Sequence, residues 1–126
     1  MIKLILIAGT GGFLGTVARF LTSRYVQNLF LPSYPLGTFL VNMAGCLLIG
    51  LLYGIAQKGD VLGNEWRLFL TVGFCGGFTT FSTFSLENLT LLREGDFLYF
   101  AIYAGLSVFL GLLATFFGHL IILKFF

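Results

Sequence analysis

The sequence predicts an all-α integral membrane protein with four transmembrane helices, and three observations support this prediction. Hydrophobic residues make up 58% of the 126 residues, and charged residues make up only 10%. The mean hydropathy is +1.00, and a soluble domain of this size has too little interior to hide so much apolar area. The apolar residues also form four runs that are each about long enough to cross a bilayer: 2–22, 36–56, 66–92 and 97–124.

The first run starts with Met1-Ile2-Lys3, as a signal peptide could. Its apolar stretch is longer than the core of a typical signal peptide and has no small-residue cleavage site, so we interpret it as the first helix. The second helix follows a turn at Gln27–Pro35, and the fixed φ of Pro35 suits its first turn. The remaining connections, Lys58–Glu65 and Arg93–Asp96, are short. Residues 1–126 therefore form a single transmembrane domain.

The third run contains a segment that should interrupt its helix. Gly73, Gly76 and Gly77 each weaken a helix by about 1 kcal/mol relative to alanine, and the β-branched pair Thr79 and Thr80 follows. We expect helical hydrogen bonding to lapse there. Broken backbone survives inside a membrane only where it is buried in protein or lines a polar path, and it often coordinates ions.

The positive charges are nearly balanced between the two membrane faces. Four helices place Lys3, Lys58, Arg67 and Lys124 on one face and Arg19, Arg24 and Arg93 on the other. So small a bias predicts insertion in both orientations and pairing of two inverted copies. The alternative is a weak bias that the first helix resolves.

Small residues four apart occur in three of the helices and let helix backbones approach closely. Two uses of these pairs stay open at this point, namely contact with another copy and packing within the four-helix unit. The pairs are Gly11 and Gly15, Gly50 and Gly54, and Ser107 and Gly111.

Polar side chains at membrane depth are the main functional candidates. Thr38 and Asn42 share one face of the second helix, and Tyr103 and Ser107 share one face of the fourth. Each carries a hydrogen-bond donor that an anion could accept. The alternative for each is a structural bond between helices.

Phe81 and Phe84 lie three apart, just after the expected break. The edge of an aromatic ring is positive, so two inward edges can stabilise an anion without holding it tightly, as conduction requires. The alternative is ordinary packing. Glu87 needs a partner or solvent at its depth, and Arg19, expected in the last turn of the first helix, can extend its charge towards the interface. For His119 we favour interfacial packing.

Several functions are disfavoured. The chain has no nucleophile with a neighbouring base, no phosphate-binding loop and no metal cluster, so we predict that it is not an enzyme. It shows no block of positive charge, and we expect no nucleic acid among its partners. Cys46 and Cys75 lie inside spans without metal-type spacing, and we interpret them as small apolar residues.

Three segments together resemble the Fluc (CrcB) family of fluoride channels. They are Gly37-Thr38-Phe39-Leu40-Val41-Asn42, the run from Gly73 to Glu87 that reads GFCGGFTTFSTFSLE, and Arg19. The resemblance covers the whole chain. It implies a passive fluoride-selective channel in the cell (inner) membrane that exports cytoplasmic fluoride. It further implies an antiparallel, dual-topology homodimer with two pores.

The resemblance also assigns roles to residues. It implies a structural sodium ion at the dimer centre, held by the backbone carbonyls of Gly76 and Thr79. It gives Arg19 and Glu87 vestibule or structural positions. At Gly111 many relatives would carry a serine, so the row of hydroxyls along the fourth helix can be shorter in this chain. The implied fluoride-pore residues are Phe81, Phe84, Asn42, Ser107, Tyr103, Thr38 and Thr83.

Two other classes of protein remain as alternatives. A small multidrug exporter also has four helices and forms antiparallel dimers, but it needs an acidic residue in its first helix, and the run 2–22 has none. A non-transporting subunit of a membrane assembly needs neither a broken helix nor paired phenylalanines.

Overall fold

The computed structural model describes residues 1–29 and 34–126, and within these ranges it contains helices and turns but no strand. Four helical spans in the described ranges are long and apolar enough to cross a membrane, which confirms the predicted fold class. The first two are α1 (Ile2–Leu29) and α2 (Leu36–Gln57), and the last is α6 (Phe97–Phe125). The third span, Asn64–Arg93, is composed of α3 (Asn64–Leu68), the π-helix η1 (Phe69–Cys75), α4 (Gly76–Phe78) and α5 (Phe81–Arg93).

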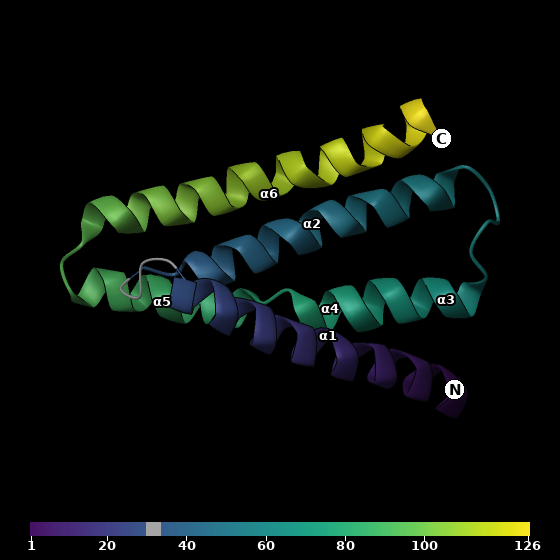
Figure 1. The fold of residues 1–126 in the computed structure, drawn as a ribbon, viewed down its shortest axis with the longest axis horizontal. Helices are drawn as coiled ribbons and strands as arrows, with labels where there is room; N and C mark the ends of the chain where they lie inside the picture. The colour runs from purple at the N-terminus through teal and green to yellow at the C-terminus, as the bar shows by residue number, and fades with distance from the viewer. Residues whose placement is uncertain (30–33) are drawn as a thin grey trace.

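The four spans run side by side, with both termini at the same end of the molecule (Figure 1). In this view α6 lies against α2, and α1 crosses the third span on the opposite side. An ion pair of 2.6 Å between Lys3 Nζ and Glu65 Oε1 links the start of α1 to the start of the third span. The alternating directions are those predicted for four successive spans.

Helix α1 is longer than its apolar run predicts. The run ends at residue 22, but the helix continues to Leu29. Gln27, which the sequence places in the turn, is therefore helical, and it accepts a hydrogen bond from the Gly37 amide at the start of α2. Residues 30–33 of the predicted Gln27–Pro35 turn lie outside the described residues. Pro35 is the N-cap of α2 rather than a residue of its first turn.

Glycines bring α2 and α6 into backbone contact. A Cβ added at Gly50 would collide with the Thr115 carbonyl, and one at Gly118 would collide with the Leu47 carbonyl. A Cβ at Gly54 would press on Ile122. The Gly50 and Gly54 pair thus serves internal packing, one of the two uses that the sequence left open.

Glycines also join α1 to the third span. A Cβ at Gly11 would collide with the Phe69 carbonyl, and one at Gly15 would collide with the Phe74 carbonyl. Gly77 similarly meets the backbone of α1 at Gly12. The absence of a side chain at these glycines lets α1 and the third span approach closely. The Gly11 and Gly15 pair is therefore also used within the four-helix unit.

The interruption of the third span differs in detail from its prediction. The glycines do not break the helix: Gly76 keeps helical angles of −62° and −37°. The extended residues are Thr79 (φ −86°, ψ 157°) and Thr80 (φ −150°, ψ 120°). Before them, η1 replaces α-helical geometry with π-helical geometry, which the sequence pattern did not predict.

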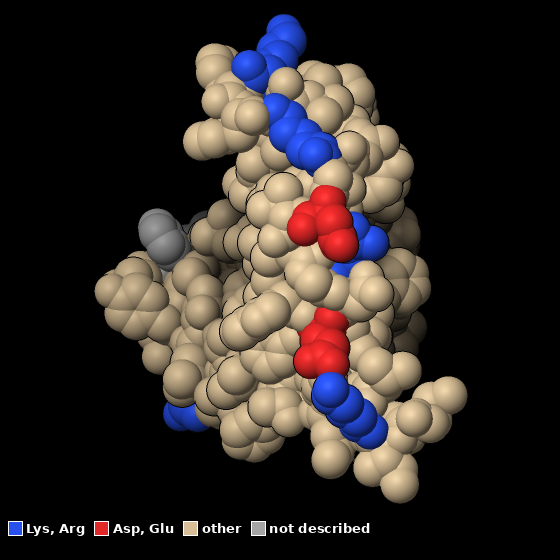
Figure 2. Space-filling model, turned by 90° about the vertical axis from the view of Figure 1, so that its right-hand side faces the viewer, with Lys and Arg blue, Asp and Glu red and all other residues tan. Residues whose placement is uncertain are grey.

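Charged side chains gather at the end of the molecule that carries both termini (Figure 2). Lys3, Lys58, Glu65 and Lys124 are exposed there. The sequence predicted Arg19 in the last turn of α1, and this prediction is wrong because the helix continues ten residues beyond it. Its Nε donates to the carbonyl of Gly77, near the middle of the third span. The bias of positive charge between the two ends is therefore four against two.

Candidate functional site

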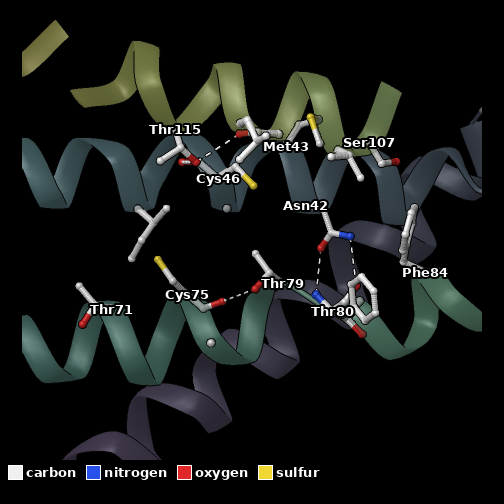
Figure 3. A pocket seen from close by; sticks show the side chains of 17 residues that line it. Asn42, Met43, Cys46, Thr71, Cys75, Thr79, Thr80, Phe84, Ser107 and Thr115 are labelled. Carbon is white, nitrogen blue, oxygen red and sulfur yellow. Dashed lines mark hydrogen bonds between the residues drawn. The ribbon is translucent and has the colours of Figure 1, made fainter. Parts of the chain in front are cut away.

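A cleft of about 510 Å³ lies between α2, the third span and α6, beside the interruption (Figure 3). It brings together six of the residues that the resemblance assigns to the fluoride pore or the sodium ion, and none of its described lining residues is charged. The six are Asn42, Gly76, Thr79, Phe81, Phe84 and Ser107. Thr38, Thr83, Tyr103, Glu87 and Arg19 are not among the lining residues.

Asn42 holds the extended backbone at the break. Its Nδ2 donates to the Thr80 carbonyl at 3.1 Å, and its Oδ1 accepts from the Thr80 amide at 2.9 Å. The side chain thus replaces the helical partner of the Thr80 amide and adds a donor to the Thr80 carbonyl, as the dashed lines in Figure 3 show. The amide group of Asn42 has two N–H donors, and this pairing uses one of them. The structural bond and the anion-facing donor, which the sequence left as alternatives, are therefore compatible.

Thr80 begins α5 as its N-cap. Its hydroxyl oxygen accepts from the Thr83 amide at 3.2 Å and lies 3.1 Å from the Thr83 hydroxyl, to which it donates. The amides of the first helical turn have no partner within the helix, so the N-terminus of a helix attracts negative charge. Because α5 begins within the third span, its positive end lies next to the cleft.

The break also changes the partners of the backbone carbonyls before it. The Gly77 carbonyl accepts from Arg19 Nε at 3.0 Å, so a side chain of α1 satisfies it. The Cys75 carbonyl accepts both the amide and the hydroxyl of Thr79. These contacts fix the end of α4 from two sides and give Arg19 a structural partner.

Three aromatic rings form a row along α5 and α6. The centroids of Phe81 and Phe84 are 5.6 Å apart with their planes tilted by 46°. Phe84 meets Tyr103 edge to face, with centroids 5.1 Å apart. Phe81 is 77% exposed, so its ring is not held by packing within this chain. Phe84 is half-buried.

Tyr103, Glu87 and Thr38 form a second polar group beyond Phe84. The Tyr103 hydroxyl donates to Glu87 Oε1 at 3.3 Å, and Thr38 lies close to both side chains. Thr38 and Tyr103 are buried. The carboxyl of Glu87 therefore has partners, as its depth in the membrane requires.

Ser107 carries a hydroxyl that is buried and has no hydrogen-bond partner among the described residues. Buried polar groups are nearly always paired, so an unpaired one calls for an explanation. Ser107 lines the cleft from α6, which offers one: its hydroxyl has no partner among the described residues and is available to a species bound at the cleft. One turn further along α6, Gly111 adds no hydroxyl and lies against Met43 and Cys46.

Sequence reasoning missed the part that Thr80 plays. Threonine is a favoured N-cap residue, and Thr80 precedes a run of helix-compatible residues, so this signal was present in the sequence. It also missed Thr115, whose hydroxyl lines the cleft and donates to the Cys46 and Gly111 carbonyls. Both cysteines are free, and His119 packs against Tyr53 with ring centroids 5.3 Å apart.

Comparison with known proteins gives one family. The model of the CrcB-like protein family, described as Camphor Resistance (CrcB), matches residues 6–119. The chain is 46% identical over 119 residues to the fluoride-specific ion channel FluC of Flavobacterium psychrophilum, covering 94% of this chain and 96% of the relative. It is 45% identical over 121 residues to FluC of Campylobacter jejuni, covering 96% and 98%. These relatives are named as ion channels and not as enzymes. The chain therefore belongs to the CrcB family.

Proposed function

We propose that this protein is a passive, fluoride-selective channel that lets fluoride leave the cytoplasm across the cell (inner) membrane. The names of its relatives support this activity. The observation that carries it is the unpartnered hydroxyl of Ser107, a residue that lines the same cleft as Asn42, where none of the described lining residues is charged.

The cleft offers several weak donors to an anion. Fluoride is small and strongly hydrated, so its water must be replaced as it passes. The free N–H of Asn42, the Ser107 hydroxyl, the ring edges of Phe81 and Phe84 and the N-terminus of α5 form such a series. Since none of the described residues that line the cleft is Lys or Arg, the ion can also be released.

The polar group beyond Phe84 extends this path. Tyr103 packs edge to face on Phe84, and its hydroxyl leads to Glu87 and Thr38. Thr83 lies on the same helix as Phe84, with its hydroxyl next to Thr80. We assign Tyr103, Thr38 and Thr83 to the pore and its approach. Glu87 and Arg19 act as structural or vestibule residues.

The same break suits a structural sodium ion held by the carbonyls of Gly76 and Thr79. Carbonyl oxygens are ligands for hard cations, and both residues line the cleft. In a continuous helix these two carbonyls would accept from the amides of Thr80 and Thr83, which instead donate to side chains. The donor set therefore fits an alkali ion, which would add a positive charge between paired backbone dipoles.

The complete channel is a homodimer with an inverted copy, carrying two pores. The cleft is open, Phe81 is largely exposed, and a Cβ at Gly76 would meet nothing within 4 Å among the described residues. These features leave room for a second copy. The bias of four positive residues against two is small enough for both orientations to insert.

A passive channel would suffice for protection. In an acidic medium fluoride enters the cell as neutral hydrofluoric acid, which dissociates in the more alkaline cytoplasm, and the anion is trapped there. The membrane potential then drives the anion out, so no energy source is needed.

Fluoride efflux from liposomes that contain only this purified chain tests the proposal. Liposomes loaded with fluoride should empty after a potassium ionophore dissipates the counter-charge, and matched liposomes loaded with chloride should not. Fluoride-loaded liposomes without protein and fluoride-loaded liposomes with the Ser107→Ala variant serve as controls. Efflux no faster than from protein-free liposomes would refute the proposed function.

The inverted dimer has its own test. Reporter fusions to the C-terminus should be active on both membrane faces, and activity on one face alone would refute it. Two or three added lysines in the Arg93–Asp96 turn should force one orientation and reduce fluoride flux. Coexpression with a variant biased the opposite way should restore the flux.

A further inference from the structure

Two backbone amides at the break donate to side chains instead of to the backbone. The amide of Thr80 donates to Asn42 Oδ1 at 2.9 Å, and the amide of Thr83 donates to the Thr80 hydroxyl oxygen at 3.2 Å. Both acceptors are partly buried, and both bonds lie at the cleft.

Helical geometry identifies what these amides would otherwise do. In an α-helix each amide donates to the carbonyl four residues earlier. The amide of Thr80 would bond to the Gly76 carbonyl, and the amide of Thr83 would bond to the Thr79 carbonyl. Two side chains have therefore taken the donors of the two carbonyls that the proposed sodium site uses.

We infer that Thr80, together with Asn42, is a positioning residue that keeps the Gly76 and Thr79 carbonyls available to the cation. This inference rests on the proposed function and goes beyond it, because it assigns a role to a residue that neither lines the ion's coordination shell nor contacts fluoride. Thr80 acts through the Thr83 amide, and Asn42 acts through the Thr80 amide.

In this mechanism the Thr80 hydroxyl oxygen and the Thr79 carbonyl oxygen compete for the N–H of Thr83. When the Thr80 hydroxyl is present, it accepts from the Thr83 amide as an N-cap does. When the hydroxyl is removed, the acceptor that helical geometry offers the same N–H is the Thr79 carbonyl, and α5 can extend backwards by a helical bond. That carbonyl oxygen would then be shared with an amide, and it would bind a cation more weakly.

Two pairs of variants isolate the hydroxyl from side-chain size. Thr80 and Thr80→Val have nearly the same shape, as do Thr80→Ser and Thr80→Ala, and in each pair only one member can cap α5. The sodium affinity of the purified protein is measured from its thermal stability in detergent as sodium replaces N-methylglucamine. We expect the dissociation constant for sodium to rise by roughly fivefold or more in both hydroxyl-free variants, as loss of an N-cap bond implies. Thr80→Ser should stay close to the parent.

Thr90→Val is the matched control. Thr90 lies on the same helix, and its hydroxyl bonds to the Leu86 carbonyl away from the cleft, so its loss should leave the sodium affinity unchanged. Equal affinities within both pairs would overturn the inference, and so would failure of Thr80→Val and Thr80→Ala to assemble even at saturating sodium. Failure of the parent to transport fluoride would instead refute the proposed function. The sodium measurement does not depend on flux, so the two failures are distinguishable.

Discussion

The α2–α6 pair and the third span satisfy their backbones in opposite ways. In α2 and α6 every turn is helical, and glycines such as Gly50 and Gly118 let the two backbones touch. In the third span the helix stops at Thr79 and Thr80, and Asn42 and Arg19 supply partners from neighbouring helices. A continuous helix can contribute only side chains to a site. A broken one contributes backbone amides and carbonyls as well, at the cost of needing outside partners.

The largest effect should come from filling the α2–α6 contact. Gly50→Ala places a methyl group against the Thr115 carbonyl, and neither backbone can move without separating the helices. Overpacking typically costs about 1–3 kcal/mol, so we expect little monodisperse protein after purification. Gly9→Ala is the control, because a Cβ there meets nothing within 4 Å among the described residues. Similar yield and melting temperature for the two variants would show that this contact is loose.

The fluoride path should respond next, without loss of fold. Phe81→Ile and Phe84→Ile keep apolar bulk but remove a ring edge, so each variant should assemble while fluoride flux falls by about tenfold or more, which corresponds to a loss of ~1.4 kcal/mol of barrier stabilisation. Liposome efflux and size-exclusion chromatography measure the two properties. If both variants assemble and conduct at the parent rate, the rings only pack.

These two regions were not equally predictable. The spans of α2 and α6 follow from apolar length, because the bilayer alone fixes how long a span must be. The break was placed within the correct segment, but two of its three glycines, Gly73 and Gly77, proved to serve contact with α1. Where the helix stops depends on Asn42, 38 residues away in sequence, and local patterns carry no information about such a partner.

The candidate site was predictable to a similar extent. Resemblance to a family gathered Asn42, Phe84 and Ser107, and the structure places them around one cleft. It did not reveal that Arg19 bonds to the Gly77 carbonyl, because the length of α1 beyond its apolar run was unknown. The cap at Thr80 escaped because it depends on an extended conformation that only tertiary contacts impose.

A smaller and more selective effect should distinguish backbone from side chain at the proposed sodium site. Thr79→Ser keeps the carbonyl and a hydroxyl that can still bond to Cys75, so it should retain the sodium dependence of flux. Gly76→Leu adds a bulky side chain on an open surface and should disrupt both the dimer and the sodium site. The comparison requires flux at several sodium concentrations and the dimer fraction by cross-linking. The same sodium dependence in both variants would contradict the assignment to these carbonyls.

Removing the Tyr103 hydroxyl should have a modest effect. Tyr103→Phe keeps the ring that meets Phe84 edge to face but loses the bond to Glu87. This bond is long at 3.3 Å, a typical hydrogen bond contributes about 0.5–1.5 kcal/mol, and Thr38 remains as a neighbour of Glu87. We therefore expect fluoride flux to fall several-fold, less than for Phe84→Ile. A larger loss than in Phe84→Ile would place the main barrier at this polar group and not at the rings.

The smallest effect should come from the ion pair at the membrane surface, which sharpens the contrast with the break. Lys3 and Glu65 are 2.6 Å apart, but their side chains are 72% and 56% exposed, so water and salt screen their attraction. Glu65→Gln should change the free energy of unfolding by less than about 1 kcal/mol. It should also leave the orientation of the chain in the membrane unchanged, because acidic residues contribute little to the charge bias.

Arg19→Gln is the comparison. It loses a bond to the Gly77 carbonyl inside the span and should lower the melting temperature clearly more than Glu65→Gln does. Both are measured at low and high salt. If Glu65→Gln proves the more damaging, contacts at the surface and not partners of the broken backbone hold the third span in place.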